Sequence, residues 1–214
     1  MTVTTPVFES ELRYLKDNGY TVIPLEQLVD NYRGNPAQPL PPKAVVIVAD
    51  DGHKSVYTDM LPLARKYHVP VTLFLYPSAI SNAPYALTWE QVKALRKTGL
   101  FDIQGHTYWH PNFKIEKKRL PPGDYDRFVD MQLKKSKDKL EKELGCKITM
   151  LAWPFGIYDD QLVKKAGEDG YKAAFTIERR RAAPSDNIMT MPRFLMTNRD
   201  SGRTFAAILG GMSP

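Results

Sequence analysis

The stretch that decides the fold runs from Ala44 to Gly52 and reads AVVIVADDG. Its apolar and largely β-branched first part is typical of a strand buried on both faces, as in a parallel sheet. Asp50 and Asp51 directly follow this strand. Burying two carboxylates there costs free energy unless the site has a role for their charge. Neighbouring side chains of an extended chain point to opposite sides, so the two acids are expected to do different work. An ordinary Asp-Gly turn is the alternative interpretation.

Strands and helices alternate along the rest of the chain and are joined by short connections. This alternation predicts a parallel α/β architecture, either an open sheet or a barrel. The proline-rich loop from Gly34 to Pro42 is too local to divide the chain, so we expect one domain over residues 1–214. Predicted strands cover residues 21–23, 44–49, 70–76, 100–104, 148–152, 173–177 and 189–191, and predicted helices cover 8–18, 25–32, 55–67, 88–97, 124–144, 159–168 and 203–209.

The composition excludes several classes of protein. With 43% hydrophobic and 25% charged residues, the chain is neither disordered, collagen-like nor of low complexity. The net charge of +6 is mild and the densest basic run, Arg179 to Arg181, is short, so nucleic-acid binding is not expected. A single cysteine, Cys146, excludes an intrachain disulfide and a multi-cysteine metal site. No apolar run reaches the roughly 20 residues of a transmembrane helix, and no signal peptide is visible at Met1.

A second polar cluster, from His106 to His110, follows the predicted strand 100–104. Two histidines four positions apart lie on the same face of one helical turn, which is the spacing by which zinc metalloproteases supply two ligands. Pro111 disfavours helical geometry at His110, so we expect one turn at the end of a strand rather than a long helix. Two unrelated surface histidines are the alternative.

Together, Asp51, His106 and His110 would form a set of two histidines and one carboxylate. Such a set leaves positions open on zinc, iron, cobalt or a similar divalent ion. A water in an open position has a lowered pKa and becomes a nucleophile near neutral pH. Asp50, beside this set, is then a natural general base.

These residues resemble the motifs of the polysaccharide deacetylases, the NodB-homology or carbohydrate esterase family 4 proteins. The segment from Ile47 to Gly52 is similar to their first motif and His106 to His110 to their second, and further similarity extends over nearly the whole chain. Residues 8–28 resemble the segment that precedes the domain in the poly-N-acetylglucosamine deacetylase branch. The third motif, which lines the substrate groove, is matched by Trp153, Pro154, Phe155 and Gly156.

The resemblance implies a distorted (β/α) barrel with fewer than eight parallel strands. It implies a hydrolase that removes acetyl groups from an N-acetylated glycan such as poly-N-acetylglucosamine, by attack of a metal-bound water on the acetyl carbonyl. Asp50 would be the base, and the metal and the Phe155 N–H would stabilise the oxyanion. The metal expected first is zinc, with cobalt, nickel or iron as alternatives. The implied ligands are Asp51, His106 and His110, and Trp153, Phe155 and Tyr158 would border a sugar ring or pack in the core.

The sequence departs from the family in three places. Ala152 stands where the third motif usually carries an arginine that orients the base, and Arg193 resembles an arginine of the poly-N-acetylglucosamine branch. Many members have a late histidine that acts as general acid, but none follows His110 here, so either His53 or a protonated Asp50 must return the proton or activity is low. Branch relatives also have an extra strand before the helix near residue 8, for which Met1 leaves no room, so either the barrel lacks its usual first strand or the given sequence is a trimmed piece.

Two other functions remain open. The same fold could hydrolyse a small amide or O-acetyl substrate, or the chain could be a degenerate glycan-binding domain without activity. The absent arginine and late histidine favour the second alternative slightly, and the complete set of Asp50, Asp51, His106 and His110 weighs against it. Extracellular or cell-envelope placement is implied by the family alone, and the oligomeric state is not indicated.

Overall fold

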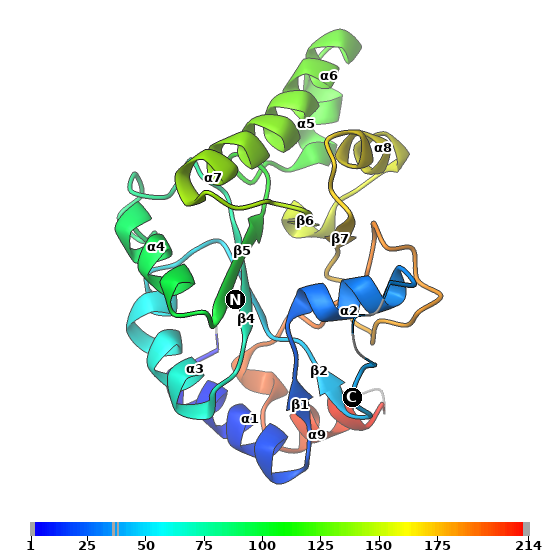
Figure 1. Ribbon diagram of the computed structural model, residues 1–214. Helices are drawn as coiled ribbons and strands as arrows, with labels where there is room; N and C mark the ends of the chain where they lie inside the picture. The colour runs from blue at the N-terminus through cyan, green and yellow to red at the C-terminus, as the bar shows by residue number, and fades with distance from the viewer. Residues whose placement is uncertain (1–2, 36, 38, 212–214) are drawn as a thin grey trace.

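The computed structural model describes residues 3–35, 37 and 39–211, and its centre is a curled sheet of parallel strands (Figure 1). The sheet has the order β3-β4-β5-β6-β7, and a separate parallel pair, β1-β2, lies beside it. This half-barrel confirms the predicted distorted (β/α) barrel with fewer than eight strands. The strands are β1 (Thr21–Val22), β2 (Ala44–Val45), β3 (Val48–Asp50), β4 (Val71–Leu75), β5 (Phe101–Gly105), β6 (Met150–Ala152) and β7 (Ala173–Phe175).

The helices surround the strands, and α5 and α6 project beyond this ring (Figure 1). Local sequence explains several helix ends. The Thr88 side chain accepts from the Gln91 N–H in a capping box, and Gly145 ends α7 in the left-handed conformation. The α-helices are α1 (Thr5–Asp17), α2 (Leu25–Tyr32), α3 (Leu61–Tyr67), α4 (Trp89–Lys97), α5 (Phe113–Arg119), α6 (Pro122–Asp130), α7 (Ser136–Leu144), α8 (Asp160–Glu168) and α9 (Arg203–Gly210). The π-helical turns are η1 (Val56–Met60) and η2 (Met131–Lys135), and the 3₁₀ turns are η3 (Pro154–Gly156) and η4 (Asn198–Asp200).

The side chains of each strand point alternately to the two faces of the sheet, and they form one apolar layer on each face. Leu73 and Leu75 of β4 join the large core between the sheet and the surrounding helices. Phe74, between them, belongs to a smaller core on the inner side of the curled sheet, where Leu25 and Val29 of α2 pack against it. Successive side chains of a strand point to opposite faces, so each strand contributes to both layers. The same alternation directs polar residues at the strand ends either into or away from the barrel.

Three secondary-structure predictions are corrected. The expected continuous strand 44–49 is divided into β2 and β3, and its residues are half-buried rather than buried on both faces, because β3 forms the edge of the five-stranded sheet. The expected helix 124–144 is interrupted by the π-turn η2. The expected strand 189–191 is a single bridge between Phe175 and Met191, since Pro192 has no N–H with which to continue a ladder.

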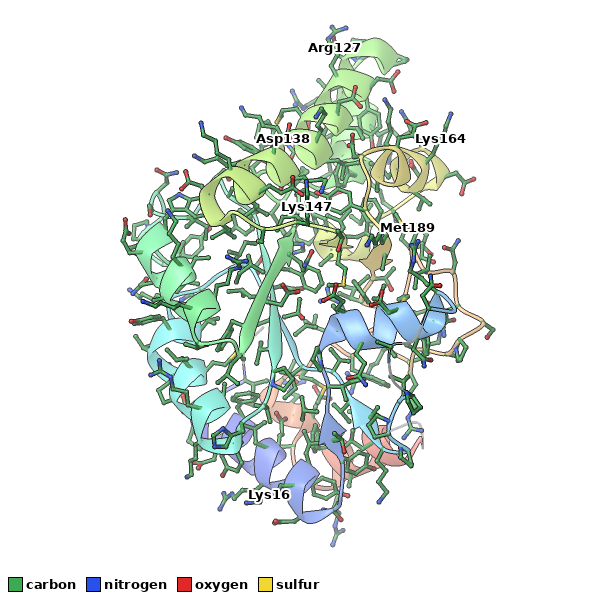
Figure 2. The ribbon with its side chains drawn as sticks, viewed as in Figure 1. Lys16, Arg127, Asp138, Lys147, Lys164 and Met189 are labelled. Atoms are coloured by element: carbon green, nitrogen blue, oxygen red, sulfur yellow. The ribbon has the colours of Figure 1, made fainter. Side chains whose placement is uncertain are left out.

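Charged side chains lie mainly on the outside of the helices, as Lys16, Arg127, Asp138 and Lys164 show in Figure 2. The basic run 179–181 is engaged within the chain, because Arg179 pairs with Asp200 and Arg180 with Asp186. Across the described residues, no helix is both long and apolar enough to cross a membrane. Met1, where no signal peptide is expected, lies outside the described part of the chain, as do residues 36 and 38 of the proline-rich loop.

Candidate active site

The candidate site lies at the carboxyl ends of the parallel strands, where α/β folds build their sites. Asp50 ends β3, and His106 directly follows β5. Gly52 completes the turn after β3 with φ +72°, and an added Cβ there would lie 2.5 Å from the Leu75 Cδ2. Because a side chain fits neither this backbone nor this space, glycine is needed for the turn that presents Asp51.

Asp51, His106 and His110 meet in a compact group. The Asp51 Oδ1 lies 3.5 Å from the His106 Nε2 and 3.7 Å from the His110 Nε2. Candidate ligand atoms of the three residues all lie within 4.8 Å of one another. Two atoms each about 2.1 Å from a tetrahedral zinc ion are about 3.4 Å apart, so the nitrogen and oxygen donors present fit such an ion.

The two imidazoles are prepared for metal binding. The His106 Nδ1 lies 2.7 Å from the Ala152 carbonyl oxygen, so a proton on Nδ1 leaves the Nε2 lone pair free. Burial, followed by the neighbouring His106, lowers the pKa of His110 and keeps its ring neutral. Burial alone would raise the pKa of Asp51, but the two histidines outweigh it and hold that pKa below its ordinary value.

Asp50 faces a different partner. Arg193 donates to both of its carboxylate oxygens, with distances of 2.9 Å from Nη1 and 2.8 Å from Nη2. The guanidinium also donates to the Thr176 carbonyl and lies over the Phe74 ring, so it is fixed on three sides. Burial would raise the pKa of Asp50, but Arg193, together with the two histidines, lowers it overall. The two adjacent aspartates therefore have separate partners.

The third motif divides into a supporting and an exposed part. Trp153 is fully buried and its indole donates to the carbonyl of Met189, which lies beside β7 (Figure 2). Of the two interpretations of Trp153, this placement favours packing in the core over bordering a sugar, because the side chain is fully buried; Pro154 is buried as well. Phe155 and Tyr158 are 54% and 44% exposed, so they can contact a ligand.

Phe155 lies directly beside the metal-ligand group, with its ring 4.6 Å from the His110 ring, centroid to centroid. Gly156 allows this position, because a Cβ there would lie 2.6 Å from the Ile177 Cγ1. Strained backbone also gathers here: Asp51, Thr107, His110 and Phe155 all have positive φ. Such conformations cost about 1–3 kcal/mol each and persist where the surroundings enforce them.

His53 lies on an exposed turn after Asp51, and its Nδ1 is 2.9 Å from the Ser55 Oγ. Its ring stacks on Tyr85 at 6.3 Å, and Tyr85 shares a hydrogen bond of 2.5 Å with the Tyr76 hydroxyl. Tyr76 in turn lies 5.6 Å from His110, ring to ring. Tyr76 and Tyr85 were not among the predicted site residues, because Tyr76 was included in the predicted strand 70–76, whereas β4 ends at Leu75 and Tyr76 directly follows it.

The fold and the site define an α/β half-barrel with a candidate centre of two histidines and one carboxylate at its strand ends. The sequence model for polysaccharide deacetylase matches residues 37–174. The chain therefore belongs to the polysaccharide deacetylase family, which makes it a hydrolase of the deacetylase class.

Curated relatives carry a more specific name. The chain is 26% identical over 207 residues to the poly-beta-1,6-N-acetyl-D-glucosamine N-deacetylase of Staphylococcus epidermidis, a match covering 92% of this chain and 68% of the relative. It is 24% identical over 240 residues to the protein of the same name from Escherichia coli K12, covering 96% of this chain but only 35% of that relative. The chain thus spans about a third of the length of the Escherichia coli protein.

Among solved structures, the deacetylase PplD of Streptococcus pyogenes, in complex with acetate, has a TM-score of 0.84 and 25% sequence identity. The alignment covers 99% of this chain and 88% of that one. The similarity therefore includes the sheet and the surrounding helices as well as the site loops.

Proposed function

We propose that this protein removes N-acetyl groups from a polysaccharide such as poly-N-acetylglucosamine, in a metal-dependent hydrolysis. The observation that carries the proposal is that the two neighbouring aspartates belong to different groups of side chains. Asp51 lies with His106 and His110, and Asp50 is bonded to Arg193. Metal-dependent hydrolysis needs a set of metal ligands with open positions and a base beside it. The group with Asp51 would supply the ligands, and Asp50 would supply the base. The relatives named above supply the glycan class.

Asp51, His106 and His110 would hold the ion. Their nitrogen and oxygen donors suit zinc first, with cobalt, nickel or iron as alternatives. A divalent ion bound there would lower the pKa of water and stabilise negative charge on an acetyl oxygen.

Asp50 is assigned as the general base. Its carboxylate adjoins the ligand set, and Arg193 fixes the orientation of both oxygens through two hydrogen bonds. Arg193 thus takes the place of the arginine that is absent at Ala152. Because the guanidinium holds the pKa of Asp50 low, the group is ionised at neutral pH and can accept a proton.

We assign the Phe155 N–H to stabilise the negative charge on the acetyl oxygen. The exposed rings of Phe155 and Tyr158 are assigned to contact the sugar. Tyr76 and Tyr85 add a second aromatic wall close to His110. Burial, followed by the hydrogen bond with Tyr85, raises the pKa of Tyr76, so this hydroxyl remains a neutral hydrogen-bonding group.

His53 or Asp50 itself returns the proton to the leaving amine. An N-acetylated glycan outside the cell or in its envelope is the proposed partner.

Acetate release from N-acetylglucosamine oligomers, with and without added zinc, tests this proposal. Zinc-dependent release by the wild type, lost in Asp50→Asn, is the expected result. Release only from small amides or O-acetyl esters would favour the small-substrate alternative. Zinc and glycan binding without any acetate would favour a degenerate binding domain.

A further inference from the structure

Two fully buried polar side chains, Gln132 and Ser136, lie far from both aspartates in sequence and are not part of the metal-ligand group. Both come from the long helical segment α6-η2-α7. Buried polar side chains are costly unless hydrogen-bonded, so their partners show what they stabilise. The Gln132 Nε2 donates to the Met131 Sδ at 3.6 Å, and the other partners belong to the backbone of residues 106–110, named here the histidine loop.

Gln132 holds the middle of the histidine loop. Its Oε1 accepts from the Tyr108 N–H and from the Trp109 N–H, each at 3.1 Å. The Ser136 hydroxyl donates to the Thr107 carbonyl oxygen at 2.8 Å. Three consecutive residues between the two candidate metal ligands are therefore bonded to one helical segment.

These bonds act on a backbone that is strained on both sides of them. Thr107 has φ +63° and His110 has φ +62°, and neither residue is glycine. A side chain in this left-handed region costs roughly 1–2 kcal/mol, so the loop needs external contacts to stay there. The Thr107 hydroxyl, which accepts from the His110 N–H at 3.2 Å, supplies one contact from inside the loop. From outside, the backbone of Ser78 and Leu75 adds one hydrogen bond each to the loop, and Gln132 and Ser136 supply the side-chain hydrogen bonds to residues 107–109.

The π-turn η2 lies at the point of contact. Gln132 lies inside this turn, and Ser136 directly follows it. The extra residue of a π-turn rotates the next part of the helix by about 100° around its axis, which changes the side chains that face the barrel. The Leu133 carbonyl in the turn accepts from the buried Tyr171 hydroxyl at 3.1 Å, which stabilises the irregular backbone. The interruption of the helix thus coincides with the residues that hold the histidine loop.

We propose that Gln132 and Ser136 are positioning residues, which hold the histidine loop in the conformation that directs both imidazoles at one metal ion. This inference rests on the metal site of the proposed function. Neither residue contacts substrate or metal; they act through the backbone of Thr107, Tyr108 and Trp109. Removing the Gln132 acceptor should let the loop relax, so that the two imidazoles no longer converge and metal affinity falls.

Zinc affinity of purified full-length variants tests the inference. Gln132→Met keeps the side-chain length and removes both hydrogen bonds. Gln104→Met is a matched control, because the buried Gln104 Oε1 likewise accepts from two backbone N–H groups, those of Thr149 and Met150, outside the histidine loop. Competition titration should show the zinc Kd of Gln132→Met raised about 10–100-fold, the range found when groups that orient metal ligands are removed. The Gln104→Met variant should retain the wild-type Kd within about threefold, well below that range.

Amide hydrogen exchange in the metal-free proteins gives a readout independent of metal. Exchange at Tyr108 and Trp109 should be about tenfold faster in Gln132→Met, the effect of losing one hydrogen bond from each amide. If that variant fails to fold, Ser136→Ala, which removes one hydroxyl, should raise the zinc Kd by a smaller factor.

The outcomes separate the two proposals. A wild type that binds no zinc overturns the proposed function and this inference with it. A wild type that binds zinc, with Gln132→Met binding it equally well, overturns this inference alone. Equal weakening in Gln132→Met and Gln104→Met also overturns it, because a general loss of stability would then explain the effect.

Discussion

Asp50 at the strand ends and Glu11 in α1 are two shielded carboxyl groups with opposite surroundings. The Asp50 side chain is 23% exposed and receives two hydrogen bonds from Arg193, and its pKa is lowered. Glu11 is 7% exposed, and among the described residues its Oε1 has no hydrogen-bond partner. Burial, with a smaller contribution from Asp200, raises the pKa of Glu11 to about 7.

The contrast shows that burial alone does not decide the charge of an acid. Burial opposes ionisation at both positions, and only at Asp50 does an arginine reverse the result. Arg193 and Asp50 are 143 positions apart in sequence, so the fold places this partner where a charged base is needed. Glu11 lacks such a partner and is expected to carry its proton over much of the range below neutral pH.

The largest effect on activity is expected from replacing Asp50, and comparison with a replacement of Asp51 separates the roles of the two aspartates. Asp50→Asn should lower kcat about 10³–10⁴-fold while zinc stays bound, because the base is lost and the ligand set is intact. Asp51→Asn should lose zinc, because one of three protein ligands is removed. Metal content and acetate release are measured on both proteins. Loss of zinc from Asp50→Asn would contradict the division of roles.

His53 and Asp50 are the two candidates for returning the proton, and replacing His53 distinguishes them. His53→Ala should lower turnover by about a hundredfold, within the range of general acid–base catalysis, and leave the zinc content unchanged. Steady-state kinetics with N-acetylglucosamine oligomers provide the measurement. Unchanged turnover would exclude His53 as the acid.

Replacing Arg193 tests the partner itself. Arg193→Lys keeps the charge but loses the planar fork that binds both oxygens of Asp50, so kcat should fall by about tenfold with little change in KM. Arg180→Lys is a control, because Arg180 forms its ion pairs with Glu178 and Asp186 on an exposed loop. A kcat of wild-type size in Arg193→Lys would show that orientation of Asp50 does not need the fork.

Glu11 should affect stability and not activity. Its pKa is about 7 in the folded protein and 4.5 in the unfolded reference, so between these values the folded state holds the extra proton. The free energy of unfolding should therefore fall as pH rises from 4.5 to 7, by an amount on the order of 3 kcal/mol. The change is absent below pH 4.5, where both states are protonated.

Glu11→Gln should remove this dependence. Urea unfolding of the metal-free proteins should show the variant more stable than the wild type at pH 8 and nearly equal to it at pH 4. A difference between the two proteins that does not change with pH would mean that Glu11 is not the titrating group.

The site residues that come directly after a strand in the chain could be predicted from the sequence. Asp50, Asp51 and His106 lie at strand ends, and a parallel sheet brings its carboxyl ends to one edge. For Trp153 the family resemblance left sugar contact and core packing open, because an aromatic residue after a strand can point either way, and the structure places its side chain inside. The pairing of Arg193 with Asp50 depends on how distant loops meet, which no local pattern encodes.

Gln132 and Ser136 could not be found from the sequence at all. They lie within a helical pattern, and a π-turn leaves the surrounding apolar residues close to helical spacing, so the interruption is invisible. Similarly, α5 (Phe113–Arg119) was not predicted, because its seven residues form too short a pattern to distinguish from a loop.

The most direct test of the account is zinc stoichiometry measured together with acetate release for the wild type, Asp50→Asn and Asp51→Asn. The account predicts bound zinc and acetate release in the wild type, bound zinc without release in Asp50→Asn, and neither in Asp51→Asn. Acetate release by a wild type that binds no divalent metal, or by Asp51→Asn without metal, would contradict it.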